Sequence, residues 1–185
     1  RALGDSKIKY LNSPETPIFI KGKMLFGLFE AKKRIHQKKN LVVVEGYMDV
    51  VSLVSSGIGN AVASLGTSLT DSQIDLLWKF VPEPTICFDG DSAGRRAALS
   101  VGYKMLPNLK PGLSCKFAIL PDGIDPDSFV RSQGLSAMRS LLGNSLALSN
   151  MLWWSEKNLK VIDTPEKEIT REMIKLTKYL NNLLG

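Results

Sequence analysis

The hydrophobic residues of this chain follow two patterns, short continuous runs and repeats at helical spacing. Residues 41–44 (LVVV) form a β-branched run without polar alternation, which predicts a strand buried on both faces. Residues 47–57 place apolar positions at helical spacing and end in Gly57, a residue suited to close a helix. Further strands are expected at 60–64, 85–88 and 114–120, and further helices at 69–81 and 92–106. This alternation predicts an α/β fold with a parallel sheet, right-handed crossovers and helices on both faces.

Local signals refine the helical segments. Thr70 and Gln73 occupy capping-box positions, which predicts that a helix begins directly after Thr70. Nearer the N-terminus, four apolar residues are interpreted as the buried stripe of one helix: Met24, Leu25, Leu28 and Ile35.

The C-terminal part of the chain has a different pattern. From about Leu135 onward the apolar spacing is all-helical, and Thr164 followed by Pro165 predicts the start of a final helix. Trp153 and Trp154 lie in this region without interleaved basic residues. Core packing is therefore favoured over base stacking for this aromatic pair.

Composition restricts the class of protein. With 185 residues and 44% hydrophobic content, the chain can bury a core. No apolar stretch approaches the roughly 20 residues of a membrane span, and no leader pattern opens the chain, so we expect a soluble, cytoplasmic protein. Cys87 and Cys115 lie in apolar strand-like runs and are expected to be reduced core residues. His36 is expected on a solvated helix rather than in a zinc site. Because the chain starts at Arg1 without a methionine, we expect it to be a fragment.

The net charge of +6 is unevenly distributed. Residues 1–40 contain ten Lys or Arg and three Asp or Glu, a balance of +7, so the remaining residues carry −1. A polyanionic partner would explain this basic segment. For the run at 31–39 (AKKRIHQKK), a solvated helix end is the favoured interpretation, because cations are stabilised at the C-terminal end of a helix dipole.

Acidic residues follow the predicted strands. Glu45 comes directly after the first strand, Asp89 and Asp91 after the third, and Asp125 and Asp127 after the last. Functional sites of open α/β sheets form outside the carboxyl ends of the strands, so these acids are expected at one edge of one sheet. Carboxylates gathered in this way raise one another's pKa unless a cation neutralises them. A hard divalent cation bound by oxygen is the simplest solution.

Each acid also has a purely structural interpretation. Asp91 could cap the helix that begins near Ser92, and Asp125 could cap the turn at Pro126 and Asp127. For any one acid taken alone, capping is the better interpretation. The coincidence of three acidic clusters at three strand ends favours a metal site at this edge.

Four segments, VVVEGYMDVVSL, NAVASLGTSLT, CFDGDSAGRRAA and LPDGIDPDSFV, occur here in the order found in the toprim domain of bacterial DnaG-type primases. Residues 9–22 (KYLNSPETPIFIKG) resemble the segment that precedes toprim in the same enzymes. The resemblance runs from about Arg1 to Gln133. It implies a Rossmann-like toprim fold, with a mainly parallel sheet and helices on both faces, followed by an all-helical subdomain. The expected regions are the end of a basic N-terminal subdomain (1–38), toprim (39–134) and a helical subdomain (135–185).

The resemblance also implies an activity, that of a DNA-directed RNA polymerase making short primers by nucleotidyl transfer. In this family the catalytic divalent metal, Mg²⁺ or Mn²⁺ and expected as two or more ions, is bound by residues matching Glu45, Asp89 and Asp91. Asp125 and Asp127 match acids that add to the metal cluster, and Asp49 matches a family acid near the site. Residues matching Arg1, Lys9 and Lys21 bind nucleotide or template.

The implied partners are single-stranded DNA template, ribonucleoside triphosphates, the RNA primer and the replicative helicase. In the family, zinc and the helicase are bound by an N-terminal and a C-terminal domain, and we expect neither domain here. We therefore expect this fragment to bind metal but to synthesise primers poorly or not at all.

Two alternatives from other functional classes remain open. Another toprim enzyme, such as a nuclease or topoisomerase, would share the Glu and Asp-x-Asp but would need its own nucleophile. No sequence feature marks any of the four tyrosines as such a nucleophile, and these are Tyr10, Tyr47, Tyr103 and Tyr179. A non-catalytic toprim module that recruits DNA or protein would make the acids dispensable.

Overall fold

The computed structural model describes residues 14–65 and 68–158. Within them, a six-stranded sheet has the order β1-β3-β2-β4-β5-β6. The four central strands are parallel, and β1 and β6 pair antiparallel at the two edges. The α/β fold with a mainly parallel sheet is therefore confirmed. The strands are β1 (Leu25–Phe26), β2 (Val42–Val44), β3 (Ala61–Ser64), β4 (Thr85–Ile86), β5 (Lys116–Phe117) and β6 (Leu146–Ala147).

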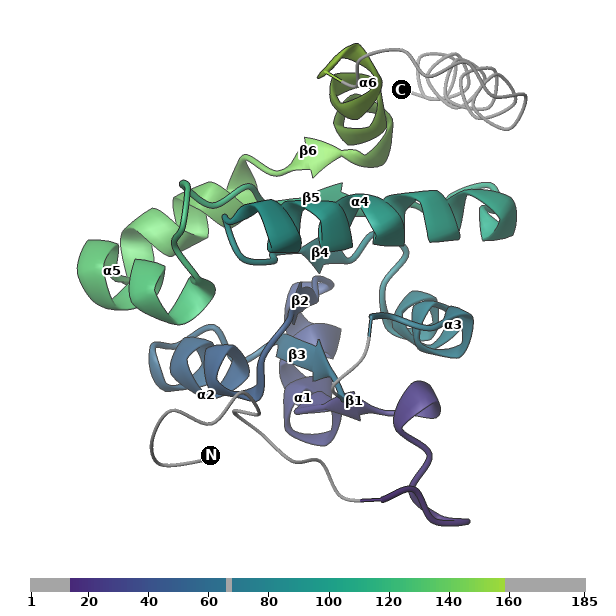
Figure 1. Cartoon of the computed structure of the whole chain (residues 1–185). Coiled ribbons are helices and arrows are strands. Elements are labelled where there is room, and N and C mark those ends of the chain that lie inside the picture. The colour runs from purple at the N-terminus through teal and green to yellow at the C-terminus, as the bar shows by residue number, and fades with distance from the viewer. Residues whose placement is uncertain (1–13, 66–67, 159–185) are drawn as a thin grey trace.

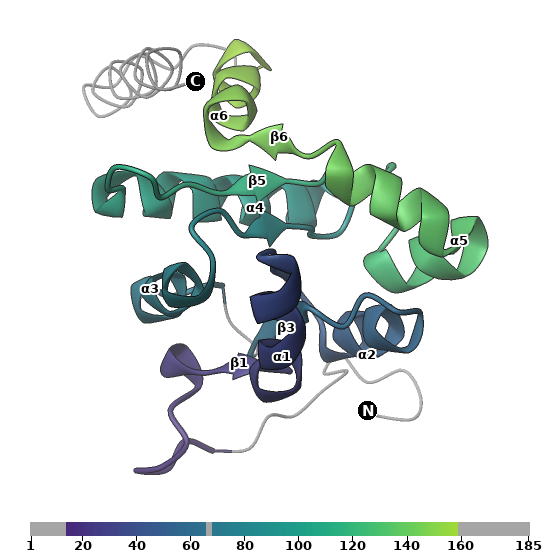
Figure 2. The ribbon, with the colours of Figure 1, turned by 180° about the vertical axis from the view of Figure 1, so that it is seen from behind.

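Helices cover both faces of this sheet. They are α1 (Leu28–Lys38), α2 (Tyr47–Ser55), α3 (Asp71–Phe80), α4 (Ser92–Met105), α5 (Pro126–Gly143) and α6 (Leu148–Asn158), with short 3-10 helices η1 (Lys21–Lys23) and η2 (Leu106–Asn108). The side chains of α2 and α5 share one core with the sheet, and those of α1, α3, α4 and α6 share the other. Figure 1 shows α2 and α5 on one side of the strands and α3 on the other. Seen from behind, α1 lies in front of β3 (Figure 2).

The run of valines in β2 explains how one strand serves both cores. Successive side chains of a strand point to opposite faces, so Val43 enters one core while Val42 and Val44 enter the other. All three are buried, and full burial of such a side chain stabilises the fold by about 1.5–3 kcal/mol. A continuous apolar run is therefore required at this position.

The helix signals read from the sequence are confirmed. Thr70 Oγ1 accepts from the Gln73 N–H at 3.2 Å, and Gln73 Oε1 accepts from the Thr70 N–H at 3.0 Å. Gly57, at φ +98°, follows α2 and donates to Val54 O, while Ile58 donates to Leu53 O. Only glycine adopts that left-handed conformation at little cost, and the two bonds satisfy carbonyls at the helix end.

The interpretation of Met24, Leu25, Leu28 and Ile35 as one helical stripe is wrong in part. Leu28 and Ile35 belong to α1, but Leu25 lies in β1 and Met24 is 41% exposed. The left-handed Gly27 separates strand from helix. The short strand was not predicted because two residues are too few to show a period.

The C-terminal region also departs from expectation. The segment from Leu135 was expected to be all-helical, but it contains the strand β6. This strand pairs antiparallel with β5 and covers its free edge. Trp153 and Trp154 are 38% and 49% exposed, so the prediction that they pack in the core is wrong. Thr164 and Pro165 lie outside the described residues.

Other expectations from composition can be compared with the fold. Cys87 and Cys115 are buried free thiols, and His36 is exposed on α1, as predicted. The basic residues at 32–34 are exposed, which confirms their solvated positions. In the described part of the chain, no helix combines the length and apolar character needed to cross a bilayer. The region boundaries predicted at residues 38 and 134 stay predictions. The sheet includes β1 from the region before residue 39 and β6 from the region after residue 134.

Candidate functional site

The acidic residues lie where three neighbouring parallel strands end. Strand β4 is hydrogen-bonded to β2 on one side and to β5 on the other. Glu45 directly follows β2, Asp89 follows β4 by three residues, and Asp125 comes after β5 at the start of α5. Because the strands are parallel, the segments that follow them meet at one edge, here called the carboxyl edge. The prediction that these acids lie at one edge of the sheet is therefore confirmed.

Glu45 and Asp89 form the centre of this cluster. The Asp89 N–H donates to Glu45 Oε1 at 3.3 Å, and Asp89 Oδ1 is buried without a hydrogen-bond partner. Burial, followed by the charge of Asp89, raises the pKa of Glu45. Burial, followed by the charges of Asp125 and Asp91, raises the pKa of Asp89. The carboxylates thus destabilise one another in their charged forms, as a site for a cation should.

Asp91 and Asp125 are confirmed as helix caps. Asp91 Oδ1 accepts from the Gly94 N–H at 2.7 Å at the start of α4, and Asp125 Oδ1 accepts from the Ser128 N–H at 2.6 Å at the start of α5. A carboxylate has two oxygens, so each cap leaves Oδ2 able to accept or coordinate. The capping interpretation is therefore compatible with metal binding, which for these residues stays a prediction.

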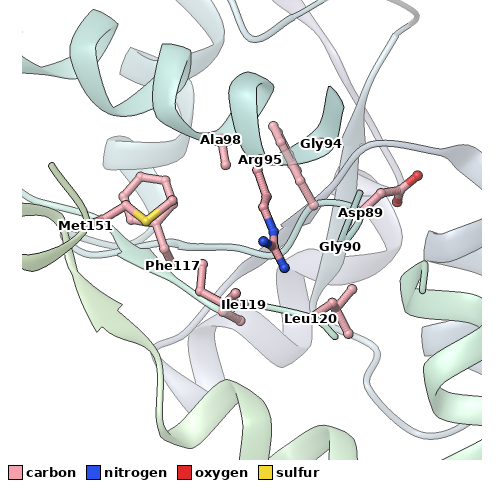
Figure 3. A pocket seen from close by; sticks show the side chains of 11 residues that line it. Asp89, Gly90, Gly94, Arg95, Ala98, Phe117, Ile119, Leu120 and Met151 are labelled. Carbon is pink, nitrogen blue, oxygen red and sulfur yellow. The ribbon is translucent and has the colours of Figure 1, made fainter. Parts of the chain in front are cut away.

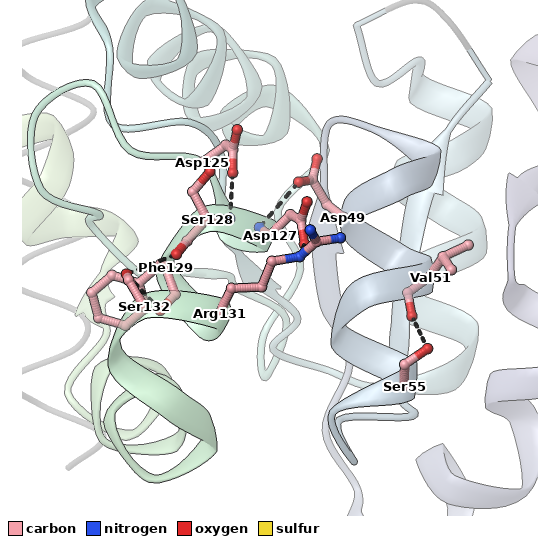
Figure 4. Close-up of polar contacts among 9 residues, drawn as sticks. All are labelled: Asp49, Val51, Ser55, Asp125, Asp127, Ser128, Phe129, Arg131 and Ser132. Carbon is pink, nitrogen blue, oxygen red and sulfur yellow. Dashed lines mark hydrogen bonds and ion pairs between the residues drawn. The ribbon is translucent and has the colours of Figure 1, made fainter. Parts of the chain in front are cut away.

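Asp49 connects two of the acidic segments. Its Oδ2 accepts from the Gly46 N–H at 3.1 Å, and its Oδ1 accepts from the Asp127 N–H at 3.3 Å, as seen beside α5 in Figure 4. The residue is only 8% exposed, and burial, followed by the charge of Asp89, raises its pKa to about 6. Both carboxylate oxygens hold backbone in place, so Asp49 positions the start of α2 against the start of α5.

Asp127 has a partner that was not predicted from the sequence. Its Oδ1 lies 2.6 Å from Arg131 Nε, one turn further along α5, and Figure 4 shows this ion pair next to Asp49. The spacing of four residues on a helix was the available signal. Asp127 Oδ1 is nevertheless buried without a hydrogen-bond partner, as Asp89 Oδ1 is, so Arg131 offsets the charge of Asp127 without satisfying this oxygen.

Gly90 allows the loops after β4 and β5 to touch backbone to backbone. A Cβ at this position would lie 1.9 Å from Pro121 O, a distance that no side chain can tolerate. The Gly90 N–H also donates to Ile124 O at 2.9 Å. The Asp89 and Asp125 segments are therefore held together by main chain, which requires glycine between Asp89 and Asp91.

Arg95 is a second residue whose role was not predicted from the sequence. It extends from α4 toward the segment with Ile119 and Leu120 (Figure 3), and its guanidinium forms an ion pair with Asp122. Arg95 Nε is buried without a hydrogen-bond partner. The pair links the helix after Asp91 to the loop before Asp125. Its signal in the sequence was the Gly-Arg-Arg that follows the Asp-x-Asp.

Of the three basic residues predicted to bind nucleotide or DNA, Lys21 alone is described. It begins η1, where Gln73 Nε2 donates to the carbonyls of Lys21 and Met24 at 3.0 and 2.7 Å. Leu25 pairs with Ser64 at the end of β3, so the segment before it lies toward the carboxyl edge. Arg1 and Lys9 lie outside the described residues.

The family resemblance implies a divalent cation at this edge, and the residue types fit one. Carboxylate oxygens are the ligands that Mg²⁺ prefers, and the buried, unpartnered Asp89 Oδ1 is such an oxygen. Within residues 14–65 and 68–158, however, no three Asp, Glu, His or Cys side chains lie close enough together to hold an ion. Shared coordination would therefore require the carboxylates to rotate from their present positions.

The sheet order, the covered faces and the acids at the carboxyl edge define a toprim-like domain, and a Toprim-like family model matches residues 42–130. A model of the N-terminal domain of the DNA primase catalytic core matches residues 1–32. The DNA primase of Pseudomonas aeruginosa is 51% identical over 140 residues, covering 76% of this chain and 21% of that protein. The DNA primase of Escherichia coli K12 is 45% identical over 166 residues, covering 90% and 29%.

Solved structures of DNA primases are similar to this chain as well. A DNA primase domain from Pseudomonas aeruginosa has a TM-score of 0.80 at 47% identity, covering 84% of this chain and 49% of that one. The Escherichia coli primase catalytic core has a TM-score of 0.79 at 45% identity, covering 90% and 53%. The chain belongs to the family of bacterial DnaG-type DNA primases. It spans about half of these solved domains and less than a third of the Pseudomonas aeruginosa and Escherichia coli primases.

Proposed function

We propose that this chain provides the toprim part of the catalytic centre of a DNA primase, which makes short RNA primers by divalent-metal-dependent nucleotidyl transfer. The observation that carries the proposal is the half-buried position of Glu45 and Asp89, where the Asp89 backbone N–H donates to Glu45 and each acid's pKa is raised in part by neighbouring carboxylates. Identity of 45% to 51% with DNA primases over most of the chain supports the same function.

In this proposal Glu45, Asp89 and Asp91 hold Mg²⁺ or Mn²⁺ at the carboxyl edge. Two such ions, when bound, supply stabilisation of the negative charge that develops on the attacking and leaving oxygens. Asp89 offers the unpartnered oxygen, and Glu45 lies beside it at the end of the adjacent strand. The caps on Asp91 and Asp125 hold each carboxylate at a helix start, where one oxygen stays available.

The remaining predicted residues have supporting roles. Asp49 and Asp127 complete the acidic set, with Asp49 holding the backbone of Gly46 and Asp127 in position. Lys21 contacts phosphates of nucleotide or template from the neighbouring edge of the sheet, and Arg1 and Lys9 are proposed to do the same. Positioning and charge neutralisation account for most of the catalysis in such a transfer.

The proposed partners follow from the family. A solved DnaG primase catalytic domain at 45% identity is described as bound to single-stranded DNA. We expect this chain to take single-stranded DNA as template, ribonucleoside triphosphates as substrates and an RNA primer as product, in the bacterial cytoplasm. Contacts with zinc and with the replicative helicase are assigned to family domains other than the regions matched here.

The metal assignment is tested with Asp89→Asn, which keeps the shape of the side chain and removes its charge. Titration of this chain with Mn²⁺, followed by calorimetry, should show at least about a tenfold loss of affinity, because a buried charged ligand is removed. Asp75→Asn, an exposed acid on α3, is the matched control and should bind like the wild type.

The catalytic assignment is tested by the same two substitutions in the full-length primase. Asp89→Asn should reduce primer synthesis by at least about a hundredfold, a typical cost of losing an electrostatic group in a catalytic site. Unchanged Mn²⁺ affinity and unchanged primer synthesis in the Asp89→Asn variant would show that the assignment is wrong. A covalent protein–DNA adduct would instead indicate a topoisomerase.

A further inference from the structure

A cavity lies at the edge of the sheet where the parallel strands begin, opposite the carboxyl edge and here called the amino edge. Its volume is about 120 Å³, well above the roughly 10–15 Å³ that one water needs. Three aliphatic residues line part of it. The rest of the lining is polar or cationic: Lys38, Asn40, Asn60, Thr85 and Arg139. Among the described residues, no carboxylate lines this cavity, in contrast to the carboxyl edge.

The polar lining is rich in hydrogen-bond donors. Asn60, only 3% exposed, donates its Nδ2 to Asn40 O at 3.2 Å and to Asn40 Oδ1 at 2.7 Å. The Asn40 amide oxygen is thereby satisfied, which leaves its NH₂ group as a donor. Lys38, Thr85 and Arg139 have no hydrogen bond or ion pair from their side chains within residues 14–65 and 68–158.

Cations from two distant helices gather around this cavity. Arg34 lies across Gly59, because a Cβ on that glycine would be 2.5 Å from Arg34 Cδ and Nε. Lys38 follows one turn later on α1. Arg139 comes from α5, and its guanidinium lies 4.0 Å from the position of a Cβ on Gly57. The basic run at 31–39 thus contributes two of the three converging charges, Arg34 and Lys38.

Helix dipoles offer a competing reason for cations at this edge. Helices α1 and α2 end beside this cavity, and each end carries about −0.5 of a charge. Together these two ends amount to about −1, which three cations exceed. Glu83, two residues before Thr85, lies 2.6 Å from Lys116 and is already neutralised. A positive potential therefore remains, and dipole compensation alone does not explain a cavity lined by donors.

We propose that this amino-edge cavity is an anion site that binds a phosphate group through Lys38, Arg139, Thr85 and the Asn40 amide. A phosphate offers several acceptor oxygens and negative charge. It therefore complements a lining that holds cations and hydrogen-bond donors. The group could belong to free phosphate or pyrophosphate, or to the backbone of a nucleic acid. The site is separate from the carboxylates, and its existence does not depend on the proposed polymerase function.

The test is an NMR titration of this chain in EDTA, with inorganic phosphate, pyrophosphate and a short single-stranded DNA as separate probes. We expect saturable shifts of the Asn60 and Thr85 amides. In a Lys38→Gln/Arg139→Gln variant the affinity should fall at least about tenfold, because two charge-assisted hydrogen bonds are lost. The matched control is Lys33→Gln/Lys79→Gln, which removes two exposed charges elsewhere and should change affinity less than about twofold.

The probes identify the source of the phosphate. Displacement of pyrophosphate by the oligonucleotide at these amides supports nucleic-acid backbone as the ligand, and absence of displacement supports a free phosphate. The proposal is overturned if no probe gives saturable shifts at Asn60 and Thr85, or if both double variants lose affinity equally. A Glu45→Gln/Asp89→Asn variant should retain phosphate binding, which separates this result from any failure of the metal site.

Discussion

At the carboxyl edge of the sheet, Glu45 and Asp89 follow adjacent strands and are placed by main-chain contacts, whereas at the amino edge Lys38 and Arg139 extend from two helices on long side chains. The first edge depends on backbone geometry, since Gly90 contacts Pro121 directly. The second depends on charge, because its cations have no protein partner in the described residues. One sheet thus presents two oppositely charged edges that should respond to different kinds of mutation.

The largest expected effect is that of Gly90→Ala. The added Cβ would lie 1.9 Å from Pro121 O, so the loops after β4 and β5 must separate. We expect a loss of about 3 kcal/mol in the free energy of unfolding, at the upper end for overpacking, measured by urea denaturation. Gly143→Ala, where a Cβ meets nothing within 4 Å, is the control and should be nearly neutral. Equal effects would show that the close backbone contact does not exist.

Next in size is Gln73→Leu, which tests how the Lys21 segment is held toward the carboxyl edge. Gln73 is fully buried, and its side chain bonds Lys21 O, Met24 O and the Thr70 N–H. Leucine leaves these groups unsatisfied, so the free energy of unfolding should fall by about 2 kcal/mol. Thermal unfolding measures the change. Gln133→Leu, an exposed position on α5, should have little effect; a similar loss there would mean that the bonds are unimportant.

The carboxyl edge should also make stability depend on pH. The folded pKa of Asp49 is raised to about 6, so the folded state binds a proton more tightly than the unfolded state. This contribution is complete below the unfolded pKa near 4 and is lost as pH rises through about 6. After allowance for solvent screening, we expect a loss of about 1–2 kcal/mol between pH 4 and pH 7 in metal-free protein.

This pH effect is measured by denaturation at several pH values with and without Mg²⁺. Asp49→Asn is the reference, because it removes the carboxylate that titrates while keeping one side-chain oxygen that can accept from the backbone. Other titrating groups cancel in the difference between the two proteins. Mg²⁺ should restore the lost stability of the wild type at pH 7 and have little effect at pH 4. Parallel pH profiles for wild type and variant would contradict the prediction.

The smallest expected effects are the coupling energies of two ion pairs, one at each edge of the sheet. A double-mutant cycle of Arg95→Gln and Asp122→Asn should give a coupling of about 0.5 kcal/mol, since the pair is partly exposed. The same cycle for Lys116→Gln and Glu83→Gln should give a similar value. Only loss of the Arg95 pair should weaken Mn²⁺ binding in calorimetry, because this pair joins the helix after Asp91 to the loop before Asp125. Equal effects on Mn²⁺ affinity would remove this distinction.

Much of the fold and of the acidic edge could be predicted from the sequence. Val42 to Val44 and the capping box at Thr70 are local signals, and each formed the expected element. The position of Glu45 and Asp89 required only the rule that parallel strands end at the same edge. Met24 and Trp154 were misplaced, because an apolar residue outside a clear period does not reveal which surface covers it.

The sequence by itself determined the alternation of strands and helices, the helix caps and the acids at the strand ends, because hydrophobic period and capping act over a few residues. Tertiary structure decided the rest. It joined Arg95 to Asp122, and it brought Arg139 to the cavity that Lys38 lines across a hundred residues of chain. These contacts depend on how helices pack on the sheet, and no local pattern encodes the direction in which a long side chain meets a distant loop.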